Sequence, residues 1–290
     1  MKKGLNAWAF PPQVAAREAI RYAKRAGYDS IELNLDETGE IGLKTPAADL
    51  KKLATYAKRQ KLEISSVSTG LYWAYNMASE DAAERKQAAK VLSTQLETAA
   101  ALGCDAILVI PGVVKAPFGD KPPVDPDACW DRALEGVRAA VAQAEDLGVT
   151  IAIENVWNMF LLSATEMRDF IDACESKAVG CYFDPANVLK CGLPDQWVRV
   201  LGKRIKRIHF KDFRRSVGTL DGFVHLLEGD MDYPAFMDAL KTARYNGYVT
   251  AEVFPYGHAL WESQIWTTSL AMDYILGRKR PKKFKGASDG

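Results

Sequence analysis

The stretch AEDLGVTIAIEN, residues 144–155, contains the pattern that decides the fold. It reads as the end of an amphipathic helix, a glycine, a short turn and a buried strand that ends in Glu154 and Asn155. Glycine suits the position after a helix because it adopts the left-handed backbone conformation without strain. The same order recurs in AKRAGYDSIELN (23–34), AAALGCDAILVI (99–110) and ARYNGYVTAEVF (243–254). Such repetition is typical of β/α units joined by short loops.

Hydrophobic periodicity extends this pattern along the chain. It predicts strands at 3–10, 30–35, 63–69, 106–111, 150–155, 179–184, 205–211 and 248–253. It predicts helices at 13–26, 46–60, 81–102, 127–147, 163–177, 195–203, 233–245 and 262–277. Eight such pairs indicate an α/β protein, a single-domain (β/α)8 TIM barrel over residues 1–278, with a flexible tail at 279–290. A doubly wound sheet is the alternative, but no GxGxxG motif follows the first strand.

Composition restricts the class of function. The 290 residues include 38 basic and 37 acidic side chains, so the net charge of +1 gives no reason to expect a nucleic acid or a membrane as partner. The five cysteines are an odd number without CxxC spacing, which indicates free thiols in a reducing compartment. No stretch is apolar over the length of a signal peptide core or a membrane span. We therefore expect a cytoplasmic enzyme that acts on a small molecule.

Four ionisable residues fall at the ends of four consecutive predicted strands. Strand residues of a barrel alternate between the interior and the helix layer, and this alternation directs Glu154, Asp184, His209 and Glu252 inward near one rim. Any one of them alone is more often a helix cap, a solvated carboxylate or a core histidine. Together, three carboxylates would repel one another unless a divalent cation compensated their charge. Three oxygens and one imidazole suit Mn²⁺ best, with Mg²⁺ or Co²⁺ as alternatives and Zn²⁺ less favoured.

These residues also lie in motifs that resemble a known family. IENV (153–156), FDPAN (183–187), HFKDF (209–213) and the passage EGDMDYPAF to GYVTAEVF (228–254) resemble the xylose isomerase-like sugar (phosphate) isomerase/epimerase family. The resemblance covers residues 3–277, and it is nearest to the pentulose-phosphate 3-epimerases. It implies that Glu154, Asp184, His209 and Glu252 bind the metal, and that Glu154 and Glu252 are the acid/base pair on opposite faces of the substrate.

The chemistry that such a site supports is removal of a proton α to a carbonyl. The metal stabilises the enediolate that forms, one carboxylate takes the proton and, for epimerisation, a second group returns it to the opposite face. Ketose 3-epimerisation is the leading reading, although 1,2-isomerisation needs only one base and the residues do not decide between them. The alternative is a lyase or dehydratase of the inosose dehydratase or C-glycoside-cleaving type. A DNA-repair endonuclease is disfavoured because the chain has only three histidines, and a non-catalytic sugar-binding barrel is the last reading.

Several other residues are candidates for substrate binding. Lys211 shares the phase of His209 and should point to the same rim, where it could offset carboxylate charge. Asn187 stands three residues after Asp184, where the free-ketohexose 3-epimerases have histidine. This departure weakens the likeness to those enzymes. Glu32 faces the interior and could contact either substrate hydroxyls or the metal ligands. Basic residues in loops could bind a phosphate: Lys115, Arg214 and above all Arg215. Aromatic residues near strand ends could pack on a sugar: Trp8, Phe10, Tyr72, Trp73 and Trp157.

Asp212 is expected to face a loop and orient lysine or backbone groups. Barrels of this kind often pair, so a homo-oligomer is possible.

Overall fold

Eight parallel strands close into a barrel in this computed structural model, which describes residues 1–255 and 260–279. The hydrogen-bonded order around the barrel is β1-β10-β7-β6-β5-β4-β3-β2. The strands are β1 (Lys2–Asn6), β2 (Ser30–Asn34), β3 (Glu63–Ser68), β4 (Ala106–Val109), β5 (Thr150–Glu154), β6 (Val179–Phe183), β7 (Ile205–Phe210) and β10 (Tyr248–Ala251). The predicted (β/α)8 barrel is confirmed.

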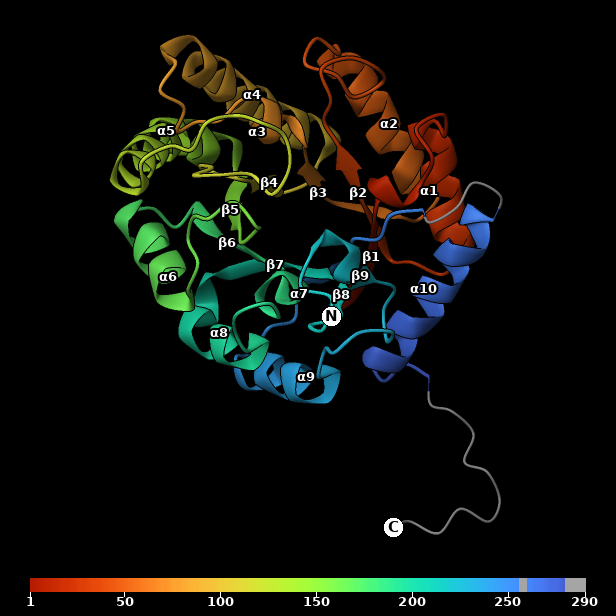
Figure 1. The fold of residues 1–290 in the computed structure, drawn as a ribbon. Coiled ribbons are helices and arrows are strands. Elements are labelled where there is room, and N and C mark those ends of the chain that lie inside the picture. Colours follow the sequence, from red (N-terminus) through yellow and green to blue (C-terminus); the bar gives the residue numbers. More distant parts are fainter. Residues whose placement is uncertain (256–259, 280–290) are drawn as a thin grey trace.

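Helices surround the strands on the outside of the barrel, as Figure 1 shows. They are α1 (Ala16–Arg25), α2 (Ala47–Arg59), α4 (Ala82–Leu102), α5 (Pro126–Leu147), α6 (Ala164–Ala173), α8 (Pro194–Leu201), α9 (Tyr233–Thr242) and α10 (Trp261–Ile275). Each corresponds to a predicted helix with small shifts at its ends. No helix in the described ranges is both long and apolar enough to cross a membrane.

Short elements fill the loops that follow the strands at the carboxyl end of the barrel. They are η1 (Ala7–Ala9), α3 (Leu71–Ala74), α7 (Pro185–Val188), η3 (Leu220–Gly222) and the antiparallel pair β8 (Asp212–Phe213) and β9 (Phe223–Val224). A further short helix, η2 (Gly202–Arg204), lies between α8 and β7. The predicted first strand, 3–10, is therefore too long. It stops at Asn6 because the Asn6 side chain accepts a hydrogen bond from the Trp8 backbone N–H at 2.7 Å and caps η1. Trp8 lies on this turn rather than on the strand.

The glycines of the repeated pattern serve the expected purpose in three of the four stretches. Gly27, Gly103 and Gly148 have φ angles of 85°, 75° and 64°. In the fourth stretch the left-handed residue is Arg244, with φ 56°, instead of Gly247. A Cβ on Gly247 would lie 2.6 Å from the Tyr245 hydroxyl, so that glycine is required for space.

The barrel core and the chain ends complete the description. Ile151 and Ile153 on β5 are fully buried, and the interior of the barrel contains the polar residues Glu32 and His209 as well as apolar ones. The tail predicted for 279–290 falls outside the described residues except for Lys279, whose Nζ lies 3.1 Å from Asp273.

Candidate active site

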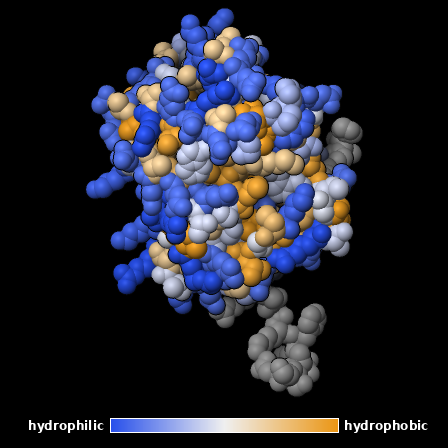
Figure 2. Space-filling view, turned by 60° about the vertical axis from the view of Figure 1, so that its left-hand side comes forward, coloured by the Kyte–Doolittle hydropathy of each residue, from blue (hydrophilic) through white to orange (hydrophobic). Residues whose placement is uncertain are grey.

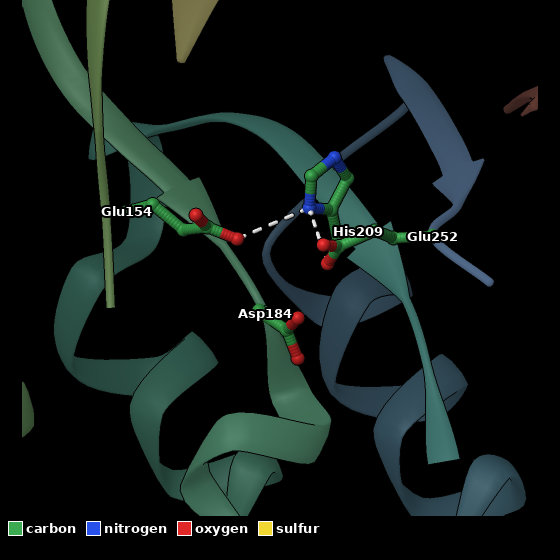
Figure 3. Close-up of side chains that lie close together, drawn as sticks. All are labelled: Glu154, Asp184, His209 and Glu252. Atoms are coloured by element: carbon green, nitrogen blue, oxygen red, sulfur yellow. Dashed lines mark hydrogen bonds and ion pairs between the residues drawn. The ribbon is translucent and has the colours of Figure 1, made fainter. Parts of the chain in front are cut away.

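The four predicted metal ligands meet at the carboxyl end of the barrel. Glu154 ends β5, Asp184 directly follows β6, His209 lies in β7 and Glu252 directly follows β10. One ligand atom from each lies within 4.8 Å of the others, and all four side chains are buried. Figure 3 shows the three carboxylates and the imidazole turned toward one another. The alternation of strand residues therefore predicted this cluster correctly.

A pair of asparagines holds Asp184 against the end of β5. The Asn155 side chain donates to the Asp184 carbonyl at 2.7 Å and accepts from the Asp184 backbone N–H at 2.9 Å. Asn187 donates from its side chain to the Asn155 carbonyl at 2.9 Å, and its backbone N–H donates to Asp184 Oδ1 at 3.0 Å. These four hydrogen bonds fix the ends of two neighbouring strands relative to each other. Asp184 also caps α7, which orients its carboxylate.

The His209 ring spans two layers of the barrel interior. Its Nδ1 lies 3.1 Å from Glu154 Oε1 and 3.2 Å from Glu252 Oε2, on the side of the carboxylate cluster. Its Nε2 lies 2.8 Å from Glu32 Oε1, deeper in the barrel. A proton on Nε2 donated to Glu32 leaves Nδ1 available as a ligand, which is the arrangement that orients metal-bound histidines. Glu32 itself is fully buried.

Glu32 is held by hydrogen bonds from three other strands. Ser66 donates to its Oε2 at 2.6 Å, and Asn6 and the Tyr182 hydroxyl also donate to its carboxylate. Burial alone would raise the pKa of Glu32, but His209 and the hydrogen bonds from Ser66 and Tyr182 hold the pKa below its ordinary value. Of the two roles predicted for Glu32, the geometry favours contact with His209, the predicted metal ligand.

Replacing Glu32 with glutamine should weaken divalent-cation binding by roughly 10- to 100-fold. The amide keeps the shape of the side chain but removes the negative charge that orients and polarises the His209 ring. Calorimetric titration with Mn²⁺ would measure the change, with Glu135→Gln on the exposed surface of α5 as the matched control. An affinity equal to that of the parent would show that Glu32 only packs. Thermal unfolding without metal would show whether the variant remains folded.

Lys211 brings a positive charge to the edge of the cluster. Its Nζ lies 2.6 Å from Glu252 Oε2 and 3.2 Å from Asp184 Oδ2, and 4.9 Å above the centre of the Phe223 ring. Burial would lower the pKa of Lys211, but the two carboxylates raise it well above its usual range. The prediction that Lys211 offsets carboxylate charge is consistent with these contacts.

The carboxylates have more negative charge than the protein groups around them compensate. Burial raises the pKa of Glu154 to about 7, against the hydrogen bond from His209, and burial also raises the pKa of Asp184. Burial acts in the same direction on Glu252, but the neighbouring Lys211 and His209 hold its pKa at about 2. Asp184 Oδ2 and Glu252 Oε2 are buried, and both depend on the single ammonium of Lys211, at 3.2 and 2.6 Å, for a nearby positive charge. Two such oxygens beside an imidazole nitrogen fit a hard divalent cation.

Asp212 organises the loop that follows β7, as expected. Its carboxylate accepts backbone N–H bonds from Phe213 at 2.8 Å, Leu227 at 3.0 Å and Met231 at 3.1 Å. The loop passes so close that a Cβ on Gly229 would lie 2.2 Å from Asp212 Oδ1. The HFKDF motif (209–213) and the EGDMDYPAF segment (228–236) are therefore parts of one structure.

We expect Asp212→Ala to destabilise the protein by about 3 kcal/mol or more. Three backbone N–H groups would lose their acceptor, and each buried donor without a partner costs roughly 1–3 kcal/mol. The midpoint of urea unfolding would measure the loss. Asp221→Ala, at an exposed position of the same loop region, should leave the midpoint unchanged within about 0.5 kcal/mol. Equal midpoints for the two variants would contradict the role given to Asp212.

A cavity of about 390 Å³ opens above the cluster, and five of the other predicted residues line it: Lys211, Asn187, Trp8, Trp73 and Trp157. Glu154, Glu252, Lys211 and Asn187 line its floor and side, and six aromatic residues surround them: Trp8, Trp73, Phe118, Trp157, Phe223 and Phe254. Glu32 is not part of the lining. Neither is Arg215, an exposed residue whose backbone N–H donates to Asp230.

Sequence reasoning missed three aromatic residues that line the cavity, and it included two aromatic residues that do not line it. Phe118 and Phe254 lie in loops and Phe223 in the two-residue strand β9, so no periodic pattern marks them and only their aromatic character could have drawn attention to them. Conversely, Phe10 and Tyr72 belong to the core. Phe10 packs on Trp261 with ring centres 5.8 Å apart, and the fully buried Tyr72 donates its hydroxyl to Gln95 at 2.8 Å.

Comparison with known proteins agrees with this architecture. The model of the family described as xylose isomerase-like TIM barrel matches residues 20–272. An Escherichia coli (strain K12) protein named "Putative L-ribulose-5-phosphate 3-epimerase SgbU" is 25% identical over 257 residues, 87% of this chain and 88% of the relative. The L-ribulose 3-epimerase of Methylomonas sp. (strain DH-1) is 27% identical over 250 residues, 82% and 78% of the two chains. A crystal structure of D-psicose 3-epimerase in the presence of D-fructose superposes with a TM-score of 0.80 at 20% identity, covering 96% of this chain and 100% of that one, which shows a shared fold.

Proposed function

The chain belongs to the xylose isomerase-like TIM barrel family, and we propose that it is a divalent-metal-dependent sugar or sugar-phosphate isomerase/epimerase, with ketose 3-epimerisation as its reaction. The observation that carries the proposal is the buried cluster of Glu154, Asp184, His209 and Glu252 at the carboxyl end of the barrel. The relatives named as L-ribulose-5-phosphate and L-ribulose 3-epimerases support the same reaction class.

Glu154, Asp184, His209 and Glu252 are the residues that would hold the cation, and Mn²⁺ is the ion that we favour. A bound cation would polarise the carbonyl and hydroxyl oxygens of the sugar and stabilise the negative charge that develops on them. The cavity above the cluster is large enough for a small-molecule ligand.

The two glutamates divide the proton transfers between them. Glu154 and Glu252 line opposite sides of the cluster, since β6 and β7 lie between β5 and β10 in the barrel. One carboxylate removes the proton from the carbon next to the carbonyl, and an enediolate results. The other group delivers a proton to the opposite face, so the configuration inverts and the mass of the sugar is unchanged. Lys211, beside Glu252, is placed to steady a developing oxyanion.

Incubation with a panel of ketoses and ketose phosphates in D₂O, with Mn²⁺ present, tests this proposal. Deuterium should appear at C3 of both the substrate and its epimer for a 3-epimerase, whereas an aldose–ketose isomerase would label C1 or C2. Loss of 18 mass units of water from the product would instead identify the alternative reaction, dehydration. A bound ion without any exchange would indicate a sugar-binding protein.

A further inference from the structure

One buried amide lies between the predicted cation site and the wall of the cavity. Hydrophilic residues cover much of the surface visible in Figure 2, whereas Asn6, the last residue of β1, is fully buried. It is paired with Glu32 in the register of β1 and β2, and it precedes by two residues Trp8, which lines the cavity. A buried amide in this position must find hydrogen-bond partners inside the barrel.

The amide nitrogen of Asn6 holds the group that lies behind the predicted metal ligand. It donates to Glu32 Oε1, the same oxygen that lies 2.8 Å from His209 Nε2. It also donates to Ser68 Oγ, at the end of β3, at 3.1 Å. An amide donor and an imidazole on one carboxylate oxygen restrict where that oxygen can lie. Asn6 therefore helps to fix Glu32 beneath His209.

The amide oxygen of Asn6 holds the wall of the cavity. It accepts the backbone N–H of Trp8 at 2.7 Å and so caps η1. A second path reaches the indole ring, because Asn34 donates to Ser68 Oγ at 2.6 Å and accepts from the Trp8 indole N–H at 3.1 Å, in the amide orientation that satisfies both neighbours. The ring then stacks on Phe254 with centres 6.2 Å apart. The backbone and the ring of Trp8 are thus both tied to Asn6.

An asparagine is suited to this double role because its short side chain has one acceptor and two donors. All three are engaged, by Trp8, Glu32 and Ser68. Aspartate would cap the turn but would place a second carboxylate against Glu32. Serine would also cap the turn, but its hydroxyl is too short to replace the bond to Glu32. The substitutions available at this position therefore separate the two bonds.

We propose that Asn6 is a positioning residue that joins the cation site to the substrate wall: its nitrogen sets Glu32 for His209, and its oxygen sets Trp8 for the sugar. This inference rests on the proposed function, since it names a residue that the proposed site requires although it contacts neither the cation nor the sugar. One residue thereby influences both metal affinity and substrate binding, and variants that remove one bond at a time separate the two effects.

Asn6→Ser tests the link to the cation site. Serine still accepts the Trp8 N–H but no longer donates to Glu32, so the affinity for Mn²⁺ in calorimetric titration should fall roughly tenfold. In the Glu32→Gln background the same substitution should change the affinity by less than about threefold, because the bond that it removes no longer orients a carboxylate. Equal effects of Asn6→Ser in the two backgrounds would overturn the proposed route through Glu32.

Asn76→Ser is the matched control. Asn76 is also a buried asparagine whose oxygen accepts the backbone N–H two residues ahead, that of Ala78, at 2.9 Å. Its nitrogen donates to the Val113 carbonyl at 2.8 Å instead of to Glu32. This variant should lose stability to urea as Asn6→Ser does, but it should bind Mn²⁺ as tightly as the parent. An equal loss of Mn²⁺ affinity in both variants would indicate general loosening and would overturn the role of Asn6.

Asn6→Ala tests the link to the wall, because alanine also removes the cap of η1. At saturating Mn²⁺, its KM for the substrate that the panel identifies should exceed that of Asn6→Ser by roughly three- to tenfold, with a similar kcat. Fluorine NMR of protein labelled with fluorotryptophan gives a readout without turnover, and loss of a resonance in Trp8→Phe identifies Trp8. That resonance should move in Asn6→Ala and keep its position in Asn6→Ser.

The outcomes for Asn6 are distinguishable from those for the proposed function. If Mn²⁺ binds but no sugar exchanges deuterium, the proposed function fails, and the Mn²⁺ affinities and the fluorine spectra still decide the role of Asn6. Parent-like Mn²⁺ affinity in Asn6→Ser, or a Trp8 resonance that does not move in Asn6→Ala, overturns the role. Absence of Mn²⁺ binding to the parent overturns both.

Discussion

Glu154→Gln and Glu252→Gln should each reduce exchange of the substrate α-proton with solvent by roughly a hundred- to ten-thousandfold. Glutamine preserves the size of the side chain but cannot accept a proton, and general base catalysis contributes a factor of this order. Both side chains reach the cavity floor, so each loss would be direct. Exchange would be followed by proton NMR in D₂O with the substrate that the panel identifies. Full exchange in both variants would remove their role as bases.

The same two residues are proposed as metal ligands, so their effects must be separated from loss of the ion. Metal content of each variant, measured by atomic emission after dialysis, provides the separation. A variant that retains its ion and loses exchange has lost a base, whereas one that loses both has lost a ligand. Glu135→Gln, an exposed glutamate on α5, should retain the ion and the exchange rate.

Removal of divalent cations should abolish activity and lower the thermal unfolding temperature by about 5 to 10 °C. Saturation at a hundred times the dissociation constant stabilises the folded state by about 2.7 kcal/mol, and each kcal/mol corresponds to about 2–4 °C in a chain of this size. Without the ion, the buried carboxylates of Asp184 and Glu252 would share the single ammonium of Lys211. Scanning calorimetry with and without a chelator measures the shift.

Asp184→Asn provides the specificity control for that experiment. Chelation should change the unfolding temperature of this variant only slightly, because the ion no longer binds tightly. The unfolding temperature of Asp238→Asn, on the exposed face of α9, should fall on chelation as that of the parent does. Identical unfolding temperatures for the parent with and without the chelator would contradict a cation at this cluster.

The residues of the cluster could be predicted because strand alternation is a local property. Once a strand is recognised, the phase of Glu154 or Glu252 follows from its neighbours, and the carboxyl end of every barrel strand lies at the same rim. The bond between His209 and Glu32 could not be predicted in this way. It joins β7 to β2 across the interior, and that contact depends on the stagger of all eight strands.

The cavity walls were the least predictable part. Phe118 and Phe254 lie in loops and Phe223 in a strand of only two residues, so no hydrophobic period relates their positions to the directions of their side chains. The left-handed conformation of Met159 and Leu161 has no local signal either, because glycine or asparagine normally occupies such positions. The neighbouring Asn158 bonds to a different loop, with its side chain donating to the Gly112 carbonyl at 2.7 Å, and that contact has no local signal.

The asparagine hydrogen bonds between the ends of β5 and β6 lower the entropic cost of binding an ion. Asn155 and Asn187 position Asp184 when the barrel folds, so the loss of chain entropy precedes the arrival of the cation. Uptake then resembles the filling of a rigid chelator: its heat would come mainly from dehydration of the ion and the carboxylates, and the amide exchange of the surrounding strands would hardly change.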